Sequence, residues 1–351
     1  MGAAMHVKFS ALLLMCFSLS VFSHAHGAAD DAVVEKNDGA VTGGIARLLV
    51  SVTDMDASLA FYRDWVGLNV VADQFVGENV LGQLWGLPAG TKARSVVLQK
   101  DAQPTLLELI EFQPRSDKPI REKANLHDFG LYDITFIVRD NDTIHRKLTE
   151  KGFAYAAHGL RYPPGLFPFD IQESILLGPD FTPITHMQML GPETIKINGN
   201  YSGIKASTQI VEHTQEAIVF YRDILGLTLR SEAVLPKGLL DKAFSLPGGT
   251  EAKMAFFNKD GSASAMLATL ELSVKGRPLS ARSGPPHIGL FMLAFETDDL
   301  SVVMKRLKKH CVLIVRGPAQ RNLEPYGNIR LLHCEGPSGI RTEIFERLND
   351  Q

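Results

Sequence analysis

The amino-acid sequence repeats itself at a fixed offset, and this repeat restricts the fold more than any other feature. The segment 58–71 (SLAFYRDWVGLNVV) returns at 217–230 as AIVFYRDILGLTLR. A second segment, 84–93 (LWGLPAGTKA), returns at 243–252 as AFSLPGGTEA. Both pairs of segments are 159 residues apart, without a gap between them. A shared offset of this kind indicates an internal duplication into two similar halves.

Length and composition agree with a folded chain of two domains. The chain has 351 residues, of which 45% are hydrophobic and 21% are charged. This length exceeds one compact core, and the composition excludes a mostly disordered protein. The duplication predicts one domain over 43–190 and another over 204–351, joined by a linker at 191–203. The net charge of −3 gives no basic surface for nucleic acid.

The N-terminal segment has the pattern of an export signal. Lys8 precedes the apolar stretch FSALLLMCFSLSVF, which is shorter than the ~20 residues that span a bilayer. Small residues follow, so we expect a signal peptide over 1–27 and a flexible leader over 28–42. An uncleaved membrane anchor is the alternative. On the signal-peptide interpretation the mature protein is periplasmic or secreted and has no membrane segment.

Removal of the signal leaves two cysteines, Cys311 and Cys334, in a compartment that permits disulfides. The runs 311–315 and 329–334 have the character of two strands of a hairpin, which would bring the two cysteines opposite one another. Two interpretations stay open, a disulfide between them or two buried free thiols.

Each half divides again into two units of one helix and several short strands. Apolar residues recur at helical spacing in 56–66, and similar helices are predicted over 142–151, 215–225 and 299–310. Short β-rich runs follow each helix, for example 105–112. The predicted unit is strand–helix–strand–strand–strand, four times over. This order gives an α+β fold of mixed sheets, with each helix packed on one face of a sheet.

This module resembles the vicinal oxygen chelate superfamily, which contains glyoxalases, bleomycin-resistance proteins and extradiol dioxygenases. The resemblance rests on FYRD followed by GL in both halves, on FIVRD at 136–140 and on GPSGIRTE at 336–343. It covers about residues 45–347 and implies four βαβββ modules in two tandem glyoxalase-like half-barrel domains. It also implies a pocket for a small molecule and one divalent metal (Fe, Mn, Zn or Ni), held by the first and last strands of the modules.

The ligand positions of the family, carried onto this sequence, form an incomplete metal site. In the first half they fall on Arg47, Glu108, Asp133 and Thr185, with His186 beside the last. In the second half they fall on Ala206, Glu271, Met292 and Glu343. The second half thus retains two carboxylates, Glu271 and Glu343, as remnants of a site.

Two versions of a first-half site follow from the resemblance. Glu108, Asp133 and His186 would hold a divalent metal if a one-residue bulge turned His186 inward. In the other version the Arg47 guanidinium, which cannot become a ligand, replaces the metal, pairs with Glu108 and holds an anionic or enolate oxygen. Asp133, partly buried near Glu108, is then expected to have a raised pKa suited to acid–base chemistry.

Arg47, Asp133 and Glu108 are the predicted catalytic residues in both versions. An Arg47–Glu108 ion pair that only fills an emptied metal site is the structural alternative. Substrate contacts are predicted for Trp85 and for an aromatic loop over 158–169 that contains Arg161, Tyr162 and Phe167. Simple loop packing is the alternative for the loop, and a structural role shared with the equivalent Phe244 is the alternative for Trp85.

Two functional hypotheses follow. The first is an exported enzyme of lyase, isomerase or ring-cleaving dioxygenase type that acts on a small organic substrate, aromatic or with vicinal oxygens, in the first half of the chain. The second is a metal-free protein that binds and sequesters a small molecule, as bleomycin-resistance proteins do. Four modules in one chain are compatible with a monomer and with a homodimer.

Overall fold

A computed structural model describes residues 39–167, 169–191 and 197–348. The expected signal peptide and residues 28–38 of the expected leader lie outside these ranges. None of the helices within them is both long and apolar enough to cross a membrane.

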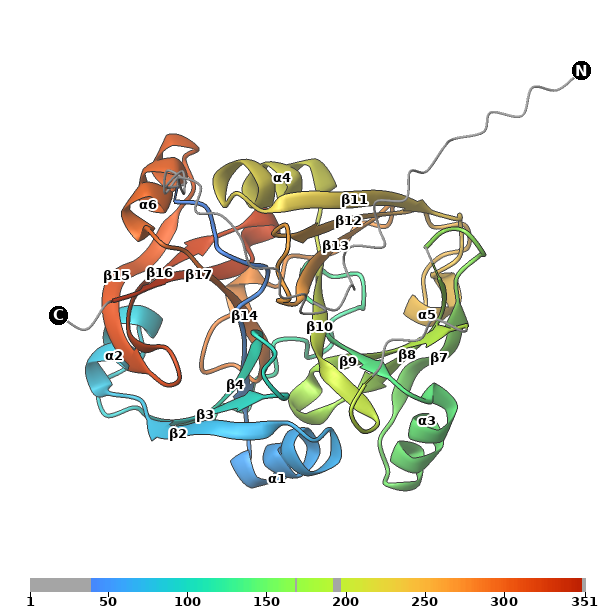
Figure 1. Cartoon of the computed structure of the whole chain (residues 1–351), viewed down its shortest axis with the longest axis horizontal. Helices are drawn as coiled ribbons and strands as arrows, with labels where there is room; N and C mark the ends of the chain where they lie inside the picture. The colour runs from blue at the N-terminus through green and yellow to red at the C-terminus, as the bar shows by residue number, and fades with distance from the viewer. Residues whose placement is uncertain (1–38, 168, 192–196, 349–351) are drawn as a thin grey trace, which may run out of the picture. The chain divides into compact units, whose positions relative to one another are not determined.

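The four predicted modules are present (Figure 1). The first contains β1 (Arg47–Val52), α1 (Met55–Leu59), the π-helical turn η2 (Ala60–Trp65), β2 (Asn69–Phe75), α2 (Glu78–Trp85), β3 (Lys92–Gln99) and β4 (Leu106–Gln113). The second, after the short β5 (Gly130–Leu131), contains β6 (Ile134–Val138), α3 (Asn141–Glu150), β7 (Tyr155–Arg161), β8 (Asp170–Leu177), η3 (Pro179–Phe181) and β9 (Pro183–Leu190).

The second half repeats this order. The third module contains β10 (Tyr201–Ile210), α4 (Thr214–Ile218), η4 (Val219–Ile224), β11 (Thr228–Leu235), α5 (Asp241–Phe244), β12 (Ala252–Asn258) and β13 (Met266–Leu272). The fourth, after η5 (Ser280–Arg282), contains β14 (Gly289–Glu296), α6 (Leu300–Lys309), β15 (Ile314–Leu323), β16 (Gly327–Glu335), η6 (Pro337–Gly339) and β17 (Arg341–Arg347).

The main helices begin and end for local reasons. The side chains of Asp54, Asp140 and Asp299 accept hydrogen bonds from backbone N–H groups in the first turns of α1, α3 and α6, which satisfies donors that have no partner inside the helix. Gly67 and Gly226 follow the two FYRD helices with φ of 84° and 79°, a conformation that favours glycine. The four helices predicted from the sequence are confirmed.

The strands form two curled sheets, and each sheet combines both halves of the chain. The eight-stranded sheet has the order β15-β16-β17-β14-β1-β4-β3-β2, and the nine-stranded sheet has β11-β12-β13-β10-β6-β9-β8-β7, with β5 paired to β10. In Figure 1 blue and red strands share one sheet, whereas green and orange strands share the other.

The modules therefore pair in a nested order. The first joins the fourth through the antiparallel pair β1–β14, and the second joins the third through β6–β10. The two half-barrels expected from the sequence are confirmed, but each is assembled from modules that belong to different halves of the sequence. The boundaries 43–190 and 204–351 stay a prediction of the sequence repeat.

Apolar side chains pack on both faces of these sheets. One large cluster lies between the helices and the sheets and draws on all four modules, with Leu48, Leu107, Ile134, Tyr221 and Phe295 among its members. A second fills the concave face of the eight-stranded sheet, with Leu49, Trp85, Phe112, Phe291 and Phe345. A third lies on the concave face of the nine-stranded sheet, with Tyr132, Ile175, Phe244 and Leu270.

The two cysteines are free, so the disulfide interpretation is wrong. The strand β15 starts three residues after Cys311, and the residue that faces Cys334 across the hairpin is Ile314. Cys334 is buried as expected for a free thiol, whereas Cys311 is exposed.

Candidate functional site

Two carboxylates on the concave face of the eight-stranded sheet bind the guanidinium of Arg47. The Nε of Arg47 lies 3.0 Å from Oε2 of Glu108 on the neighbouring strand β4. Its Nη2 contacts Oε1 of Glu343 on β17. All three side chains are buried. The Arg47–Glu108 pair expected from the sequence is present, and Glu343 joins it because the fourth module completes this sheet.

Further side chains surround the two carboxylates. Arg321 donates to Oε1 of Glu108, which also accepts from the Ser95 hydroxyl at 2.6 Å. His333 Nε2 lies 3.0 Å from Oε2 of Glu343. Burial raises the pKa of Glu343, but Arg47 and His333 outweigh burial and hold the pKa at about 2. Both carboxylates are therefore kept ionised by cations of the protein itself.

The donor set of this half-barrel does not fit a divalent metal. Of the four ligand positions that the family resemblance implies here, Glu108 and Glu343 are carboxylates, but Arg47 and Met292 are not ligands for a hard cation. The Arg47 guanidinium also binds both carboxylates. Across the described ranges no group of three or more His, Cys, Asp or Glu side chains is arranged to hold a metal.

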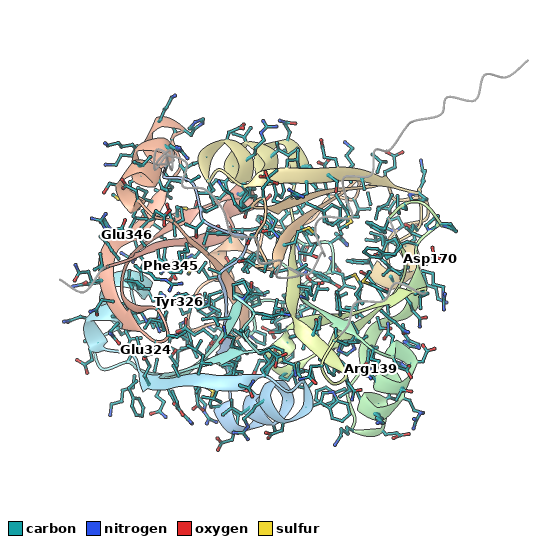
Figure 2. The ribbon with its side chains drawn as sticks, in the orientation of Figure 1. Arg139, Asp170, Glu324, Tyr326, Phe345 and Glu346 are labelled. Atoms are coloured by element: carbon teal, nitrogen blue, oxygen red, sulfur yellow. The ribbon has the colours of Figure 1, made fainter. Side chains whose placement is uncertain are left out.

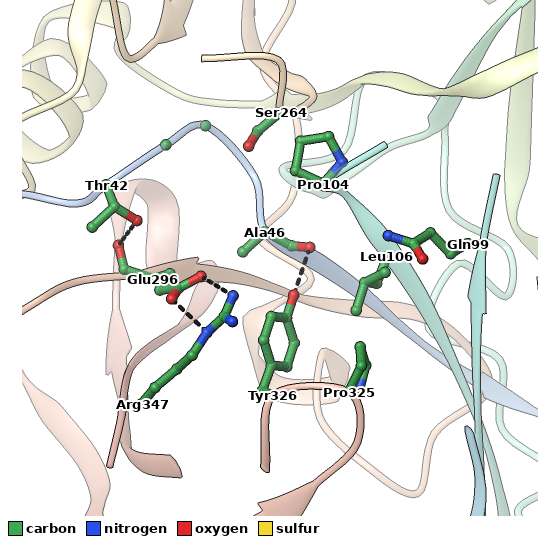
Figure 3. A pocket seen from close by; sticks show the side chains of 12 residues that line it. Thr42, Ala46, Gln99, Pro104, Leu106, Ser264, Glu296, Pro325, Tyr326 and Arg347 are labelled. Atoms are coloured by element: carbon green, nitrogen blue, oxygen red, sulfur yellow. Dashed lines mark hydrogen bonds and ion pairs between the residues drawn. The ribbon is translucent and has the colours of Figure 1, made fainter. Parts of the chain in front are cut away.

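A pocket of about 330 Å³ lies at the rim of the same half-barrel (Figure 3). Tyr326, in the turn between β15 and β16, lines this pocket and also covers Arg47, whose Cζ lies 5.7 Å from the ring centroid. The Tyr326 hydroxyl donates to the carbonyl of Ala46 at 3.2 Å. Figure 2 shows Tyr326 and Phe345 within the curl of the red strands. Tyr326 thus closes the pocket on the side of the buried Arg47.

Asp133 lies in the other half-barrel. Its Oδ1 accepts a hydrogen bond from the Thr208 N–H at 2.7 Å, and its Oδ2 accepts from the hydroxyls of Thr185 and Thr135. Burial raises the pKa of Asp133, and these donors offset the effect only in part. The prediction that Asp133 lies near Glu108 is wrong, because the first and second modules contribute to different sheets.

A second carboxyl group, Glu173 on β8, faces the same concave surface as Asp133. The Tyr162 hydroxyl donates to Oε2 of Glu173 at 2.7 Å, and both side chains are partly exposed. Burial, with a smaller contribution from Asp133, raises the pKa of Glu173 to about 7. The Tyr162 ring packs 5.1 Å from Phe167. Tyr162 and Phe167, both predicted to contact substrate, therefore lie together beside an ionisable group that the sequence did not reveal.

Equivalent positions in the two half-barrels differ in exposure. Counted from the Gly-Pro that precedes β9 and β17, Glu173 is equivalent to Leu331, and Met187 is equivalent to Phe345. Glu173 lies opposite Met187 on the neighbouring strand, and Leu331 lies opposite Phe345 in the same way. Leu331 and Phe345 are fully buried, whereas Glu173 and Met187 are partly exposed. The concave face of the nine-stranded sheet is therefore accessible where that of the eight-stranded sheet is filled.

Tyr132 is buried on this face without a hydrogen-bond partner. Its side chain is 3% exposed, and no described residue accepts or donates a hydrogen bond at its hydroxyl. The ring stacks on Phe244, with centroids 5.4 Å apart, and the Cζ of Arg121 lies 5.3 Å from its centroid. Neither Tyr132 nor Arg121 belongs to a sequence motif, and the position of Tyr132 beside Asp133 was the only signal that pointed to either residue.

His186 lies on the opposite face of the nine-stranded sheet from Asp133. The pairing of β6 with β9 is regular, with Thr135 opposite Thr185 and Phe136 opposite His186, so no bulge turns the imidazole inward. His186 is buried near the Tyr201 hydroxyl, and burial lowers its pKa to about 3. The predicted metal set of Glu108, Asp133 and His186 is therefore not assembled.

Glu271 also lies away from the concave faces. Its carboxylate accepts from the Thr214 N–H at 2.7 Å, at the start of α4, and lies 3.5 Å from Lys253 Nζ. In the first module Val97 pairs with Glu108. Phe256, the repeat equivalent of Val97, pairs with Ala268 in the third module. The assignment of Glu271 as the equivalent of Glu108 was therefore wrong, because the strand register places Ala268 at that position.

The remaining predicted contacts are separate from Tyr162. Trp85 packs in the filled half-barrel, 5.5 Å from the Phe112 ring and 6.2 Å from the Phe291 ring. Arg161 is exposed and donates to Gln172 at 2.8 Å. Tyr162 follows the end of β7, and its hydroxyl contacts Glu173 instead of Gln172.

Comparisons with known proteins agree with this architecture. A sequence profile of the Glyoxalase/Bleomycin resistance protein/Dioxygenase superfamily matches residues 44–159 and 203–344. Glyoxalase I from Zea mays is similar in structure, with a TM-score of 0.58 and 12% identity over 87% of this chain and 93% of that one. A putative dioxygenase from Bacillus subtilis has a TM-score of 0.54 and 13% identity over 88% and 86%. At these low sequence identities, the structural similarity shows a shared fold. A search of curated proteins finds no significant match.

Proposed function

Because this chain belongs to the Glyoxalase/Bleomycin resistance protein/Dioxygenase superfamily, we propose that it is a metal-independent lyase or isomerase whose substrate binds in the nine-stranded half-barrel. The observation that carries this proposal is the hydrogen bond from Tyr162 to Glu173 on a partly exposed concave surface. The apolar residues around it, among them Leu160, Ile175 and Met254, suit a small organic molecule with few polar groups.

Glu173 has the properties of a general base. Its pKa of about 7 keeps a substantial fraction ionised near neutral pH, and proton transfer is most effective when the pKa of the base lies near the working pH. Tyr162 holds Oε2 of the carboxylate in place, and Oε1 would accept the proton. Asp133 is fixed by three donors and is a positioning residue whose charge helps to raise the pKa of Glu173.

The proposed chemistry requires no metal. In the nine-stranded half-barrel the family's ligand positions, corrected for strand register, hold Asp133, Thr185, Ala206 and Ala268, and this set offers one carboxylate. We do not propose ring-cleaving dioxygenase activity, because that reaction needs an open metal site that binds O₂. Proton abstraction beside a carbonyl group needs only a placed base and an apolar site.

Solvent deuterium exchange tests the proposal. EDTA-treated protein is incubated with 2-oxobutyrate in D₂O, and loss of the C3 proton signal is followed by NMR. We expect exchange by the wild type and a loss of about 10²-fold or more in Glu173→Gln, because general-base catalysis contributes about 10²–10⁴-fold. Glu271→Gln is the matched control with a carboxylate on the outer face. An exchange rate in Glu173→Gln equal to the wild-type rate would contradict the assignment.

A small-molecule binding protein without turnover is the second candidate. The observation that favours it is the loss of metal-ligand positions in both half-barrels, since Arg47 fills one set and Thr185, Ala206 and Ala268 weaken the other. In that case Glu173→Gln binds a hydrophobic probe such as phenylacetamide as the wild type does, and no 2-oxo acid exchanges protons.

We also propose that the protein is exported, because residues 1–27 have the composition of a signal peptide. Sequencing of the N-terminus of protein recovered from cells tests this proposal. A mature chain that begins just after Ala25 or Gly27 is expected, and a chain that begins at Met1 contradicts it.

A further inference from the structure

We propose that the ligand of the nine-stranded half-barrel carries a carboxylate or similar organic anion, which Arg121 and Tyr132 recognise. This inference rests on the proposed small-molecule site and adds the chemical class of its occupant. Two observations support it independently, a cation that no described carboxylate hydrogen-bonds and a hydroxyl without a described partner.

Arg121 is a half-buried cation that is bound only by neutral groups. Its Nη1 donates to the carbonyl of Leu131 at 3.0 Å, and its Nη2 donates to the carbonyls of Asn125 and Leu126 at 3.0 and 3.2 Å. A guanidinium has five N–H groups, so two of them lack a partner within the described part of the chain. The carbonyls fix its position, but no described carboxylate accepts a hydrogen bond from it, and Asp128 and Asp133 act on its charge only through space.

The nearest carboxylates are engaged elsewhere. Asp128 pairs with Arg277 at 2.8 Å, and Asp133 accepts from Thr208 and two threonine hydroxyls. An anion from outside the chain would therefore supply the directly hydrogen-bonded counterion that Arg121 lacks among the described residues.

Tyr132 adds a directed hydrogen-bond donor. Its ring is held between Phe244 and Arg121, so the direction of its hydroxyl is set by packing. A buried hydroxyl without an acceptor destabilises a protein unless a water molecule or ligand satisfies it. A carboxylate oxygen would satisfy this donor, and the apolar side chains of the concave cluster, including Leu160 and Ile175, would contact the rest of the molecule.

Two probes of nearly equal shape test the inference. Binding of phenylacetate and of its neutral counterpart phenylacetamide is measured by ligand-observed NMR titration at pH 6 and low salt. For the wild type we expect phenylacetate to bind at least about tenfold tighter, since a charge-assisted hydrogen bond exceeds a neutral one. Arg121→Met should remove this preference, and Tyr132→Phe should weaken phenylacetate several-fold. Arg146→Met, at an exposed arginine of α3, is the control.

The outcomes separate this inference from the proposed function. Equal affinities for the two probes overturn the anion preference and leave the small-molecule site standing. No binding of either probe contradicts the small-molecule site and the anion preference together. Arg121 also holds three backbone carbonyls, so the melting temperature of each variant is measured. Should Arg121→Met fail to fold, the wild-type comparison and Tyr132→Phe still decide the question.

Discussion

The Nε of Arg47 lies 3.0 Å from Oε2 of Glu108, and neither side chain is exposed to solvent. Glu343 binds the same guanidinium from another strand, so one arginine neutralises carboxylates from the first and the fourth modules. A fixed side-chain cation thus occupies the centre of the filled half-barrel. Its contribution should be visible in the stability of the protein, because removal of one member leaves buried charges without compensation.

Replacement of Arg47 by Met should lower the free energy of unfolding by about 3–5 kcal/mol, the range found when one partner of a buried ion pair is removed. Urea denaturation followed by circular dichroism measures this change. The exposed pair of Arg63 and Asp64 supplies the control, since Arg63→Met should stay within about 0.5 kcal/mol of wild type. A change as small as the control's in Arg47→Met would contradict a structural role for the cluster.

Acid should weaken the protein through Glu343. The pKa of Glu343 in the folded protein is about 2, below its ordinary value of 4.5, so the folded state binds the proton less tightly than the unfolded state. The resulting stabilisation is present above pH 4.5 and is lost as the pH falls toward 2. Urea denaturation at several pH values should show this slope, and the slope should be smaller in Glu343→Gln. An identical slope in both proteins would refute the depressed pKa.

Glu173 should act in the opposite direction. Its pKa in the folded protein is raised from 4.5 to about 7, so folding takes up a proton between these values. The free energy of unfolding should therefore decrease as the pH rises from 4.5 to 7. In Glu173→Gln this decrease should be smaller, and the variant should be more stable than wild type above pH 7. Equal pH profiles for the two proteins would show that burial does not perturb this carboxyl group.

Metal removal should leave the protein unchanged. Because Arg47 already binds Glu108 and Glu343, dialysis against EDTA should alter the melting temperature by less than about 1 °C; each kcal/mol of stability shifts it by roughly 2–4 °C in larger domains. Elemental analysis should find less than one equivalent of Fe, Mn, Zn or Ni per chain. A stoichiometric metal whose removal lowers the melting temperature would overturn the interpretation of the Arg47 cluster.

Local features of the fold could be predicted from the sequence. The FYRD segments, with Asp54 before the first and Gly67 and Gly226 after them, set helix boundaries through contacts within a few residues. The fixed offset of the repeat indicated two similar halves, and the helix and strand patterns within each half indicated four modules. These predictions succeeded because they depend on short-range geometry and alternation, which the sequence records directly.

Which residues meet in each half-barrel could not be predicted, because it depends on contacts between distant segments that no local sequence pattern indicates. A repeat does not specify which modules pair, so Asp133 was placed beside Glu108 although their sheets differ. A shift in strand register put Ala268 where Glu271 was expected. Tyr132 and Arg121 were missed because their significance lies in hydrogen-bond partners that the described residues do not supply, and only a three-dimensional structure can show this.

The nested pairing of modules has a consequence for synthesis of the chain. The strands of the second and third modules can complete their sheet while the ribosome is still making the fourth, because domains form as the chain emerges. The strands β1 and β4 leave the ribosome first, yet β1 finds its partner β14 only near the end of translation. Until then the edge of β1 is an unpaired template for other chains, so the first module stays open to wrong pairing for longer than the two modules that follow it.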